Sequence, residues 1–265
     1  MRQSEWTYTR ASAIGTSHQR RDEICQDYSL VRCLPINKDE GRWALFAAVA
    51  DGAGTARFSA KGAKLAVHDL EQEVRRNLGK CKTNLTVDKL KEAVLKTSNY
   101  IEDYANRSGH KSRDYASTLI CTILLSDQAW YLQVGDGAAV FRYEQQRVVN
   151  YWPAKGEYGN ETFFITDENV LDQLHIQEIQ MPDEVTLFTD GLESIALNLT
   201  SKEVHQPFYE SFYRVLRQRK AGFQKDLAKG LANWMQTDLV TSRSDDDKSL
   251  VLISRVRGSE PPSNS

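Results

Sequence analysis

Residues 43–54 read WALFAAVADGAG, an apolar run of strand-forming residues that stops abruptly at Asp51-Gly52. A carboxylate at the end of a buried strand, next to a residue without a side chain, is a suitable place to hold a cation. Asp-Gly is also among the commonest turn signals, so one example by itself indicates only a turn. Nearly the same motif, however, occurs at two further positions in the chain.

The composition is that of a globular protein. Of the 265 residues, 40% are hydrophobic and 26% are charged, which is typical of a chain with a sizeable core. A formal net charge of -2 provides no global basic field for nucleic acid or for an anionic membrane. No apolar run is long enough to span a bilayer, and the first ten residues do not resemble a signal peptide. We therefore expect a cytoplasmic protein without nucleic-acid or membrane partners. We also expect it to be a monomer.

Strand and helix patterns alternate along the chain. Apolar residues at helical spacing predict one helix from Phe58 and a second from near Thr86 to Ser108-Gly109. Between residues 115 and 152, four strand-like segments are joined by very short turns. These turns require antiparallel pairing, because a parallel return needs a dozen or more residues. A buried strand at 184–191, two further helices and a last strand at 244–256 complete the pattern.

This order of elements predicts an α+β fold, with two facing antiparallel β-sheets flanked by helices on both outer faces. Each predicted helix has a single apolar stripe, which suits packing on the outside of a sheet. We expect residues 1–257 to form a single domain, because no repeat or linker divides them. Residues 258–265 have the composition of a disordered tail, and the polar residues 153–169 are expected to form an exposed flap.

Carboxylates recur at the ends of the predicted strands. Three apolar strands end in VADG (49–52), VGDG (134–137) and FTDG (188–191), and two more strands are preceded by Gln26-Asp27 and by the acidic run at 245–247. Antiparallel neighbours place the ends of some strands and the beginnings of others at one edge of a sheet. Five aspartates can converge in this way: Asp27, Asp51, Asp136, Asp190 and Asp246.

Carboxylates gathered in a partly dry site cannot all stay ionised unless cations neutralise them. Hard oxygen ligands select magnesium, manganese or calcium over zinc or copper. The alternative is that the five aspartates occupy separate turns on a solvated surface. The repeated motif favours a shared site, and the spacing alone predicts a divalent-metal site and nothing more specific.

The ordered set of motifs resembles the metal-dependent protein serine/threonine phosphatases of type 2C, the PPM family. The resemblance rests on Gln26-Asp27, VADGAG (49–54), ASTLICTILL (116–125) with VGDG, FTDGL (188–192) and DDKSLVLI (246–253). It covers the chain from about residue 12 to residue 254. The form ADGAG followed by SAKGA (59–63) is similar to a bacterial branch of the family. The resemblance implies a central β-sandwich with two metals at one edge.

The resemblance also implies a role for each carboxylate. Asp51 resembles the aspartate that bridges both metals, and the Gly52 carbonyl resembles a ligand of one of them. Asp190 and Asp246 resemble ligands of the other metal. Asp27 resembles a residue that acts mainly through metal-bound water, and Asp136 stands where many members hold a weaker third metal. The expected cofactors are two Mn²⁺ or Mg²⁺ ions per chain, with a possible third.

The activity implied is hydrolysis of phosphoserine and phosphothreonine by a hydroxide bound to two metals about 3.5–4 Å apart. The metals also neutralise charge on the phosphoryl oxygens as the bond breaks. No covalent enzyme intermediate is needed, and no cysteine here has the loop and arginine of a cysteine-based phosphatase. The expected partners are a phosphorylated protein substrate and a cognate Ser/Thr kinase, which the phosphatase opposes in bacterial signalling.

The chain departs from the family where the substrate phosphate is held. An arginine often stands five residues before the aspartate of the first motif, but here that position is Asp22. Arg21 can serve if the register slips by one residue; otherwise it is a solvated surface residue. Arg57 and Lys61, near the start of the first long helix, are further candidates for attracting phosphate.

A second departure concerns the proton for the leaving group. Ala53 replaces a histidine that some members have after Asp51-Gly52. Metal-bound water or His18 must then supply the proton, although a loop histidine without this role is the simpler interpretation of His18. In the flap, Glu157, Asn160 and Glu161 are candidates for contacts with the site or a partner, or are simply solvated.

Two other functions remain open at the level of sequence. A binding or signalling module could keep the fold with weak or no turnover. The missing arginine favours this alternative, and the full set of costly carboxylates argues against it. The third hypothesis is a metal-dependent hydrolase of small phosphate esters. The sequence shows no signature of a deep basic pocket, which leaves this hypothesis open.

Overall fold

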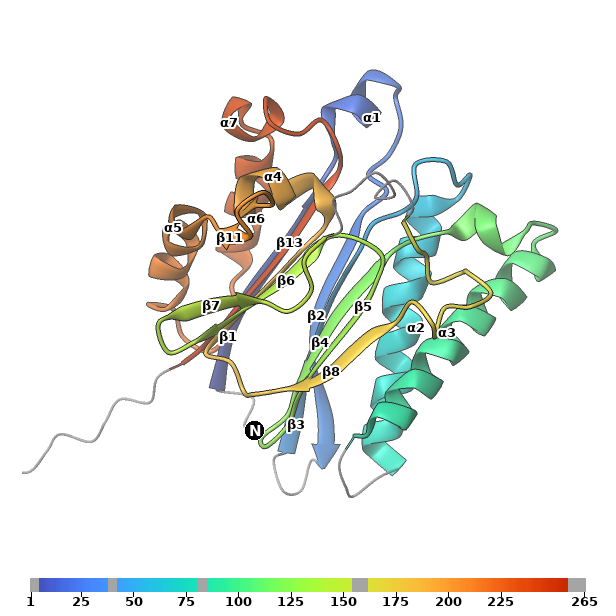
Figure 1. Ribbon diagram of the computed structural model, residues 1–265, viewed down its shortest axis with the longest axis horizontal. Coiled ribbons are helices and arrows are strands. Elements are labelled where there is room, and N and C mark those ends of the chain that lie inside the picture. The colour runs from blue at the N-terminus through green and yellow to red at the C-terminus, as the bar shows by residue number, and fades with distance from the viewer. Residues whose placement is uncertain (1–4, 38–41, 81–84, 154–161, 257–265) are drawn as a thin grey trace, which may run out of the picture.

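The computed structural model describes residues 5–37, 42–80, 85–153 and 162–256, and its elements form a layered sandwich (Figure 1). The first half of the chain contains β1 (Trp6–Ala13), α1 (Thr16–Arg20), β2 (Tyr28–Asn37), β3 (Arg42–Ala50), α2 (Ser59–Lys80), α3 (Val87–Arg107), η2 (Ser112–Tyr115), β4 (Leu119–Leu124) and β5 (Ala129–Val134). The second half contains β6 (Ala138–Tyr143), β7 (Gln146–Val149), β8 (His175–Ile179), β9 (Glu184–Phe188), η3 (Asp190–Leu192), α4 (Glu193–Ala196), β10 (Leu197–Asn198), β11 (Glu203–Val204), α5 (Gln206–Leu216), β12 (Gly222–Phe223), α6 (Lys225–Met235), α7 (Asp238–Thr241) and β13 (Lys248–Arg255).

Two sheets form the middle of the sandwich. One has the strand order β12-β1-β13-β9-β6-β7, and the other has the order β2-β3-β4-β5-β8. Every neighbouring pair in these sheets is antiparallel except β1 and β12, which pair in parallel over two residues. α2 and α3 cover the outer face of the five-stranded sheet, and α4 to α7 lie against the six-stranded sheet (Figure 1). The predicted fold class is confirmed.

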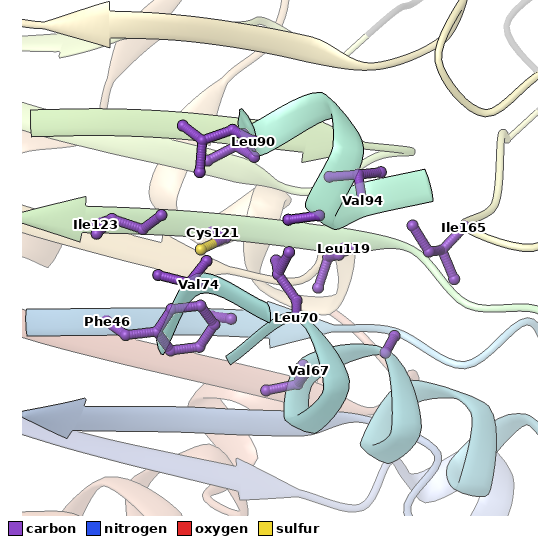
Figure 2. Close-up of a cluster of buried hydrophobic side chains, with 14 of the residues drawn as sticks. Phe46, Val67, Leu70, Val74, Leu90, Val94, Leu119, Cys121, Ile123 and Ile165 are labelled. Atoms are coloured by element: carbon purple, nitrogen blue, oxygen red, sulfur yellow. The ribbon is translucent and has the colours of Figure 1, made fainter. Parts of the chain in front are cut away.

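Three apolar layers hold the sandwich together, and β3 contributes to two of them. Phe46, Ala48 and Ala50 pack under α2 and α3 in the layer that Figure 2 shows. The alternate residues Leu45, Ala47 and Val49 pack between the two sheets. A third layer lies between the six-stranded sheet and α4 to α7. Because both faces of β3 are buried, its sequence is apolar at nearly every position instead of alternating.

The two long helices begin and end close to where the sequence predicts. At the start of α3, the Thr86 hydroxyl accepts a hydrogen bond from the Lys89 amide at 3.4 Å, which caps the helix. Val67, Leu70 and Val74 of α2 face Leu90 and Val94 of α3 above the sheet (Figure 2). Among the residues that the structure describes, no helix is long and apolar enough to cross a membrane.

Some predicted loops contain order that the sequence does not reveal. The polar segment after β1 includes the short helix α1, and an unpredicted edge strand, β8, pairs with β5. Of the predicted flap, residues 154–161 lie outside the described residues, and Glu157, Asn160 and Glu161 lie outside with them. Ile165, by contrast, is fully buried in the layer under α2 and α3 (Figure 2), so the prediction of an exposed flap is wrong at this residue. The single-domain boundary at residue 257 and the tail at 258–265 stay predictions.

Candidate metal centre

Strand register brings the carboxylates to one edge of the sandwich. Tyr28 of β2 pairs with Ala50 of β3, so the next residues outward, Asp27 and Asp51, lie beside each other. In the other sheet, Phe188 of β9 pairs with Ala138 of β6 and with Leu250 of β13. The carboxylates that flank these strands therefore lie at the same end of the sheet. The loop with Asp136 passes from β5 in one sheet to β6 in the other.

Three of these side chains come close enough to share a cation. Asp51, Asp136 and Asp190 each offer one carboxylate oxygen, and the three oxygens lie within 4.8 Å of one another. Asp27 adjoins this group: it is within hydrogen-bonding reach of Asp51 and accepts a hydrogen bond from the Thr189 hydroxyl at 2.6 Å. The structure thus brings together residues from three strand ends and the start of a fourth strand.

Asp246 lies just outside the group of three oxygens. Its charge still acts on Asp51 and Asp190, whose pKa values it helps to raise. The Asp246 carboxylate accepts a hydrogen bond from the Asp247 amide at 2.8 Å, and its carbonyl accepts one from the buried Lys248 ammonium. Asp136, by contrast, belongs to the close group, although the sequence analysis assigns it only to a weaker third site.

Two of the Asp-Gly glycines are required by close packing. A Cβ atom at Gly52 would lie 2.8 Å from the Gln26 carbonyl oxygen and 2.7 Å from the Ser59 carbonyl carbon. A Cβ atom at Gly191 would collide with the carbonyl oxygen of Asp247. Glycine is therefore needed where the strand ends approach neighbouring backbone, and these approaches bring the aspartates together.

Burial and mutual repulsion make ionisation of the cluster costly. Burial, and then the nearby charges of Asp136 and Asp246, raise the pKa of Asp190 to about 8. Burial also raises the pKa of Asp27 to about 7, against hydrogen bonds that lower it. The pKa of Asp51 is raised well above its ordinary value by burial, with Asp27 and Asp190 as the next causes. Without a cation, protons must neutralise part of this group.

The donor set fits hard divalent cations. One oxygen each of Asp27, Asp136 and Asp190 is buried without a hydrogen-bond partner among the described residues. A buried carboxylate oxygen without a partner is costly, and coordination of a cation would satisfy it. All side-chain donors in the cluster are carboxylate oxygens, which suit magnesium or manganese better than zinc or copper.

A residue that the sequence analysis did not single out, Asp247, ties the site together. Its buried carboxylate accepts hydrogen bonds from the Gly15 amide at 2.6 Å and from the Gln26 amide at 2.5 Å. The Nδ1 atom of His18 lies 2.9 Å from the same carboxylate, and Nε2 lies 3.5 Å from Glu23. His18 is therefore a buried residue of α1, not a loop histidine. The acidic run at 245–247 was visible in the sequence, but not which of its members turns inward.

The structure pairs both arginines of the first motif with acids. Arg21 Nε lies 3.1 Å from a Glu23 carboxylate oxygen, and Arg20 lies 3.1 Å from Asp245. Asp22, which stands at the position of the family arginine, has a left-handed backbone with φ of 54°. Arg21 is thus near the site along the chain, but its guanidinium is already paired.

Two other positively charged side chains, Arg57 and Lys61, lie near the start of α2, the long helix that follows Asp51. Arg57 and Lys61 are exposed and form no ion pair within the described part of the chain. The Arg57 guanidinium carbon lies 5.0 Å from the centre of the Phe58 ring, and Lys61 Nζ lies 5.4 Å from that of Tyr104. Ala53, at the position of the missing histidine, has no ionisable side chain; its amide donates to the Ala116 carbonyl and its carbonyl accepts from the Ala56 amide.

Carboxylates gathered at one edge of a two-sheet sandwich suit a site for divalent cations, which metal-dependent hydrolases use. A sequence model of the family described as protein phosphatase 2C matches residues 14–236. The curated serine/threonine-protein phosphatase 3 of Escherichia coli (strain K12) is 30% identical over 248 residues, which are 93% of this chain and 97% of that protein. The chain belongs to the protein phosphatase 2C family.

Solved structures share the fold. Serine/threonine phosphatase Stp1 from Staphylococcus aureus is 15% identical with a TM-score of 0.60, and the match covers 95% of each chain. The catalytic domain of the serine/threonine phosphatase PstP, in complex with two manganese ions, is 13% identical with a TM-score of 0.60. That match covers 96% of this chain and 99% of the other. The predictions of the family and of a serine/threonine protein phosphatase are confirmed. The carboxylate cluster fits the predicted Mn²⁺ or Mg²⁺, and the alternative of an inactive module is not favoured.

Proposed function

We propose that the chain removes phosphate from phosphoserine and phosphothreonine in proteins, with two divalent cations held at the carboxylate edge. One observation carries this proposal. Asp51, Asp136 and Asp190 come from three separate strand ends, and their oxygens lie within 4.8 Å of one another. A turn on a solvated surface gives no reason for three carboxylates to approach so closely, whereas a shared cation does.

The proposed ligands follow the positions of the side chains. Asp51 is close to Asp27, Asp136 and Asp190 and would help to hold both cations, together with the Gly52 carbonyl. Asp190 and Asp246 would hold the second cation, and Asp27 would act through water. Asp136 is close enough to Asp51 and Asp190 to support the same site or an additional cation. Cations bound there would lower the pKa of a water molecule and offset negative charge on the phosphoryl group.

Positively charged side chains near the carboxylate cluster are the candidates for binding the substrate phosphate. Arg57 lies six residues after Asp51 and is free of ion pairs within the described residues. Arg21 would have to leave Glu23 before it could contact a phosphate. We therefore assign phosphate attraction first to Arg57 and Lys61. Arg21, which the sequence predicts for this catalytic role if the register slips by one residue, is the second candidate.

The biological setting is inferred from the chemistry of the substrate. Phosphoserine and phosphothreonine arise by transfer of phosphate from a nucleotide, so a Ser/Thr kinase must supply the substrate. Such a kinase works where ATP is present, which supports a cytoplasmic location and a role that opposes the kinase in signalling. That the protein is a monomer stays a prediction.

Release of phosphate from a phosphothreonine peptide, with and without Mn²⁺, tests the proposal. The intact chain should turn over the peptide only with the cation, and Asp51→Asn and Asp190→Asn should lose this activity. Binding of the peptide without metal-dependent turnover would instead support the binding-module alternative. Comparing kcat/KM for the peptide and for small phosphate esters distinguishes a protein phosphatase from a small-ester hydrolase.

A further inference from the structure

A pocket of about 500 Å³ lies between α4, the β10–β11 hairpin and Arg243, and it has no role in the chemistry described above. Its walls are α4, the β10–β11 hairpin and Arg243, which lies between α7 and β13. The volume is in the range of pockets that hold a ligand or a large side chain. In Figure 1, α4 and β11 lie on the side of the six-stranded sheet that faces away from α2 and α3.

The chain connects this pocket directly to two proposed metal ligands. Ser194 in the pocket wall follows Asp190 by four residues, within the continuous helical path of η3 and α4. At a rise of about 1.5–2 Å per residue, the two Cα atoms are separated by roughly 6–8 Å. Arg243 precedes Asp246 by three residues. A residue that flanks the phosphorylated side chain of a bound polypeptide is therefore within reach of these wall residues.

The pocket is formed before any ligand binds. The Asn198 side-chain oxygen accepts hydrogen bonds from the Thr200 amide at 3.1 Å and from the Ser201 amide at 3.2 Å, which closes the turn of the hairpin. The His205 amide donates to the Ala196 carbonyl at 2.9 Å, and this bond attaches the hairpin to α4. A wall fixed in this way loses little conformational entropy when a ligand binds.

The lining combines apolar and polar side chains with one unpaired cation. Ile195, Leu199 and Val204 line the pocket, and Arg243 is exposed and forms no ion pair or side-chain hydrogen bond within the described part of the chain. The acid of the pocket, Glu203, accepts a hydrogen bond from the Ser201 hydroxyl at 2.8 Å. An unpaired guanidinium next to an apolar wall suits a ligand with an apolar stem and an anionic end.

We propose that this pocket is a specificity subsite for the phosphoprotein substrate, and that it takes an anionic side chain close to the phosphorylated residue. The carboxylate of a glutamate, or a second phosphate, would pair with Arg243, while the stem of the side chain packs on the hairpin. The subsite rests on the proposed phosphatase function and adds to it a preference for acidic or multiply phosphorylated sequences.

Phosphothreonine peptides that differ at one flanking residue test the subsite. Glutamate, phosphoserine, glutamine or lysine is placed at each flanking position in turn, and kcat/KM is measured with Mn²⁺. Every value is divided by that of the same enzyme for a small aryl phosphate, which does not reach the pocket. At one flanking position, the intact chain should prefer glutamate over lysine by about tenfold. The phosphoserine arm shows whether a phosphate serves as well as a carboxylate.

Charge reversal at Arg243 provides the decisive comparison. Arg243→Gln should abolish the preference for glutamate, and Arg243→Glu should reverse it in favour of lysine. Arg75→Glu is the matched control, because Arg75 is also exposed and unpaired within the described residues but lies far along α2. This control should keep the preference.

The outcomes separate the two proposals. Normal metal-dependent turnover without any preference for an anionic flank would overturn the subsite alone, as would a preference that survives in Arg243→Glu. If the intact chain hydrolyses none of the substrates, the aryl phosphate included, both the phosphatase function and the subsite are overturned.

Discussion

At the residue scale, the charge of the Asp190 carboxylate destabilises the metal-free chain. Asp190 is half-buried near the charges of Asp136 and Asp246, and its raised pKa reflects the cost of holding a charge there. We predict that Asp190→Asn raises the free energy of unfolding of the metal-free chain by about 1–2 kcal/mol, because an amide of the same shape carries no charge. The same substitution should lower Mn²⁺-dependent kcat/KM by about 10²–10³-fold.

Chemical denaturation in a chelator and phosphopeptide assays with Mn²⁺ check the two halves of this prediction. Asp127→Asn is the control, since Asp127 lies in the β4–β5 turn, at the far end of β4 from the metal edge. The control should change neither quantity. A variant Asp190→Asn that is less stable than the parent in chelator would contradict the assignment of Asp190 to a charged cluster.

A second residue-scale prediction compares Arg57 and Arg21 as the side chain that binds the substrate phosphate. Arg57→Gln should lower kcat/KM for a phosphopeptide by about tenfold, mainly through KM, because Arg57 is exposed and unpaired within the described residues. Arg21→Gln should have a smaller effect, because Glu23 already holds its guanidinium. Steady-state kinetics at fixed Mn²⁺ decides, with Arg75→Gln as the control. The opposite order of effects would return the role to Arg21.

These residues also show how far the sequence leads. The repeated Asp-Gly motif identifies Asp51, Asp136 and Asp190, because each ends an apolar strand and antiparallel pairing collects strand ends at one edge. It does not show that Asp136 belongs to the close group, since that depends on where the β5–β6 loop crosses between sheets. Nor does it show that Arg21 pairs with Glu23, which depends on the conformations of two exposed side chains.

At the element scale, one buried carboxylate contacts the segment between β1 and β2 near both of its ends. Asp247 accepts hydrogen bonds from the amides of Gly15 and Gln26, which flank this segment, and contacts His18 inside it. This contact links α1, and the loop that ends at Asp27, to the start of β13. Polar composition predicts a plain loop here, since neither a five-residue helix nor a distant carboxylate leaves a periodic pattern.

We predict that Asp247→Ala lowers the free energy of unfolding by about 2–4 kcal/mol, because the buried Gly15 amide and the half-buried Gln26 amide lose their acceptor. It should also raise the Mn²⁺ concentration needed for half-maximal activity, because Asp27 loses its fixed position. Asp247→Asn, which keeps one acceptor oxygen, should recover part of both effects. Denaturation curves and Mn²⁺ titrations provide the measurements.

The matched control for this prediction is Asp245→Ala. Asp245 is in the same acidic run, but its side chain is exposed and pairs with Arg20 at the surface. Such pairs contribute about 0–1 kcal/mol, so the control should be nearly neutral. A loss of stability in Asp247→Ala with an unchanged Mn²⁺ requirement would show that Asp247 supports the fold without positioning the metal ligands.

At the scale of the whole molecule, the fold explains why the site could be predicted and some connections could not. Both faces of β3 are buried, so its continuous apolar sequence indicates a strand that is covered on both sides. β8 is an edge strand with largely exposed side chains, so no hydrophobic pattern marks it. Ile165 packs under the helices from a polar segment, because a single buried residue carries no periodicity.

The last prediction concerns the pH dependence of stability. The carboxyls of Asp27 and Asp190 have ordinary pKa values of 3.8, raised in the folded chain to about 7 and about 8. Between these limits, the folded metal-free chain binds more protons than the unfolded chain. The free energy of unfolding therefore falls as pH rises through this window. We expect a loss on the order of a few kcal/mol in chelator between about pH 4 and pH 8.

Mn²⁺ should reverse this trend, because it replaces the protons and stabilises the folded state by mass action. The increase in Tm caused by saturating Mn²⁺ should be small near pH 5 and should grow toward pH 8. In Asp190→Asn, which removes one titrating group, the metal-free curve should be flatter. Thermal unfolding of both proteins across this range, with Mn²⁺ or chelator, makes the comparison. An Mn²⁺-induced shift that is equal at both ends would mean that these carboxylates do not bind the cation, because competition between protons and metal at one site makes the shift depend on pH.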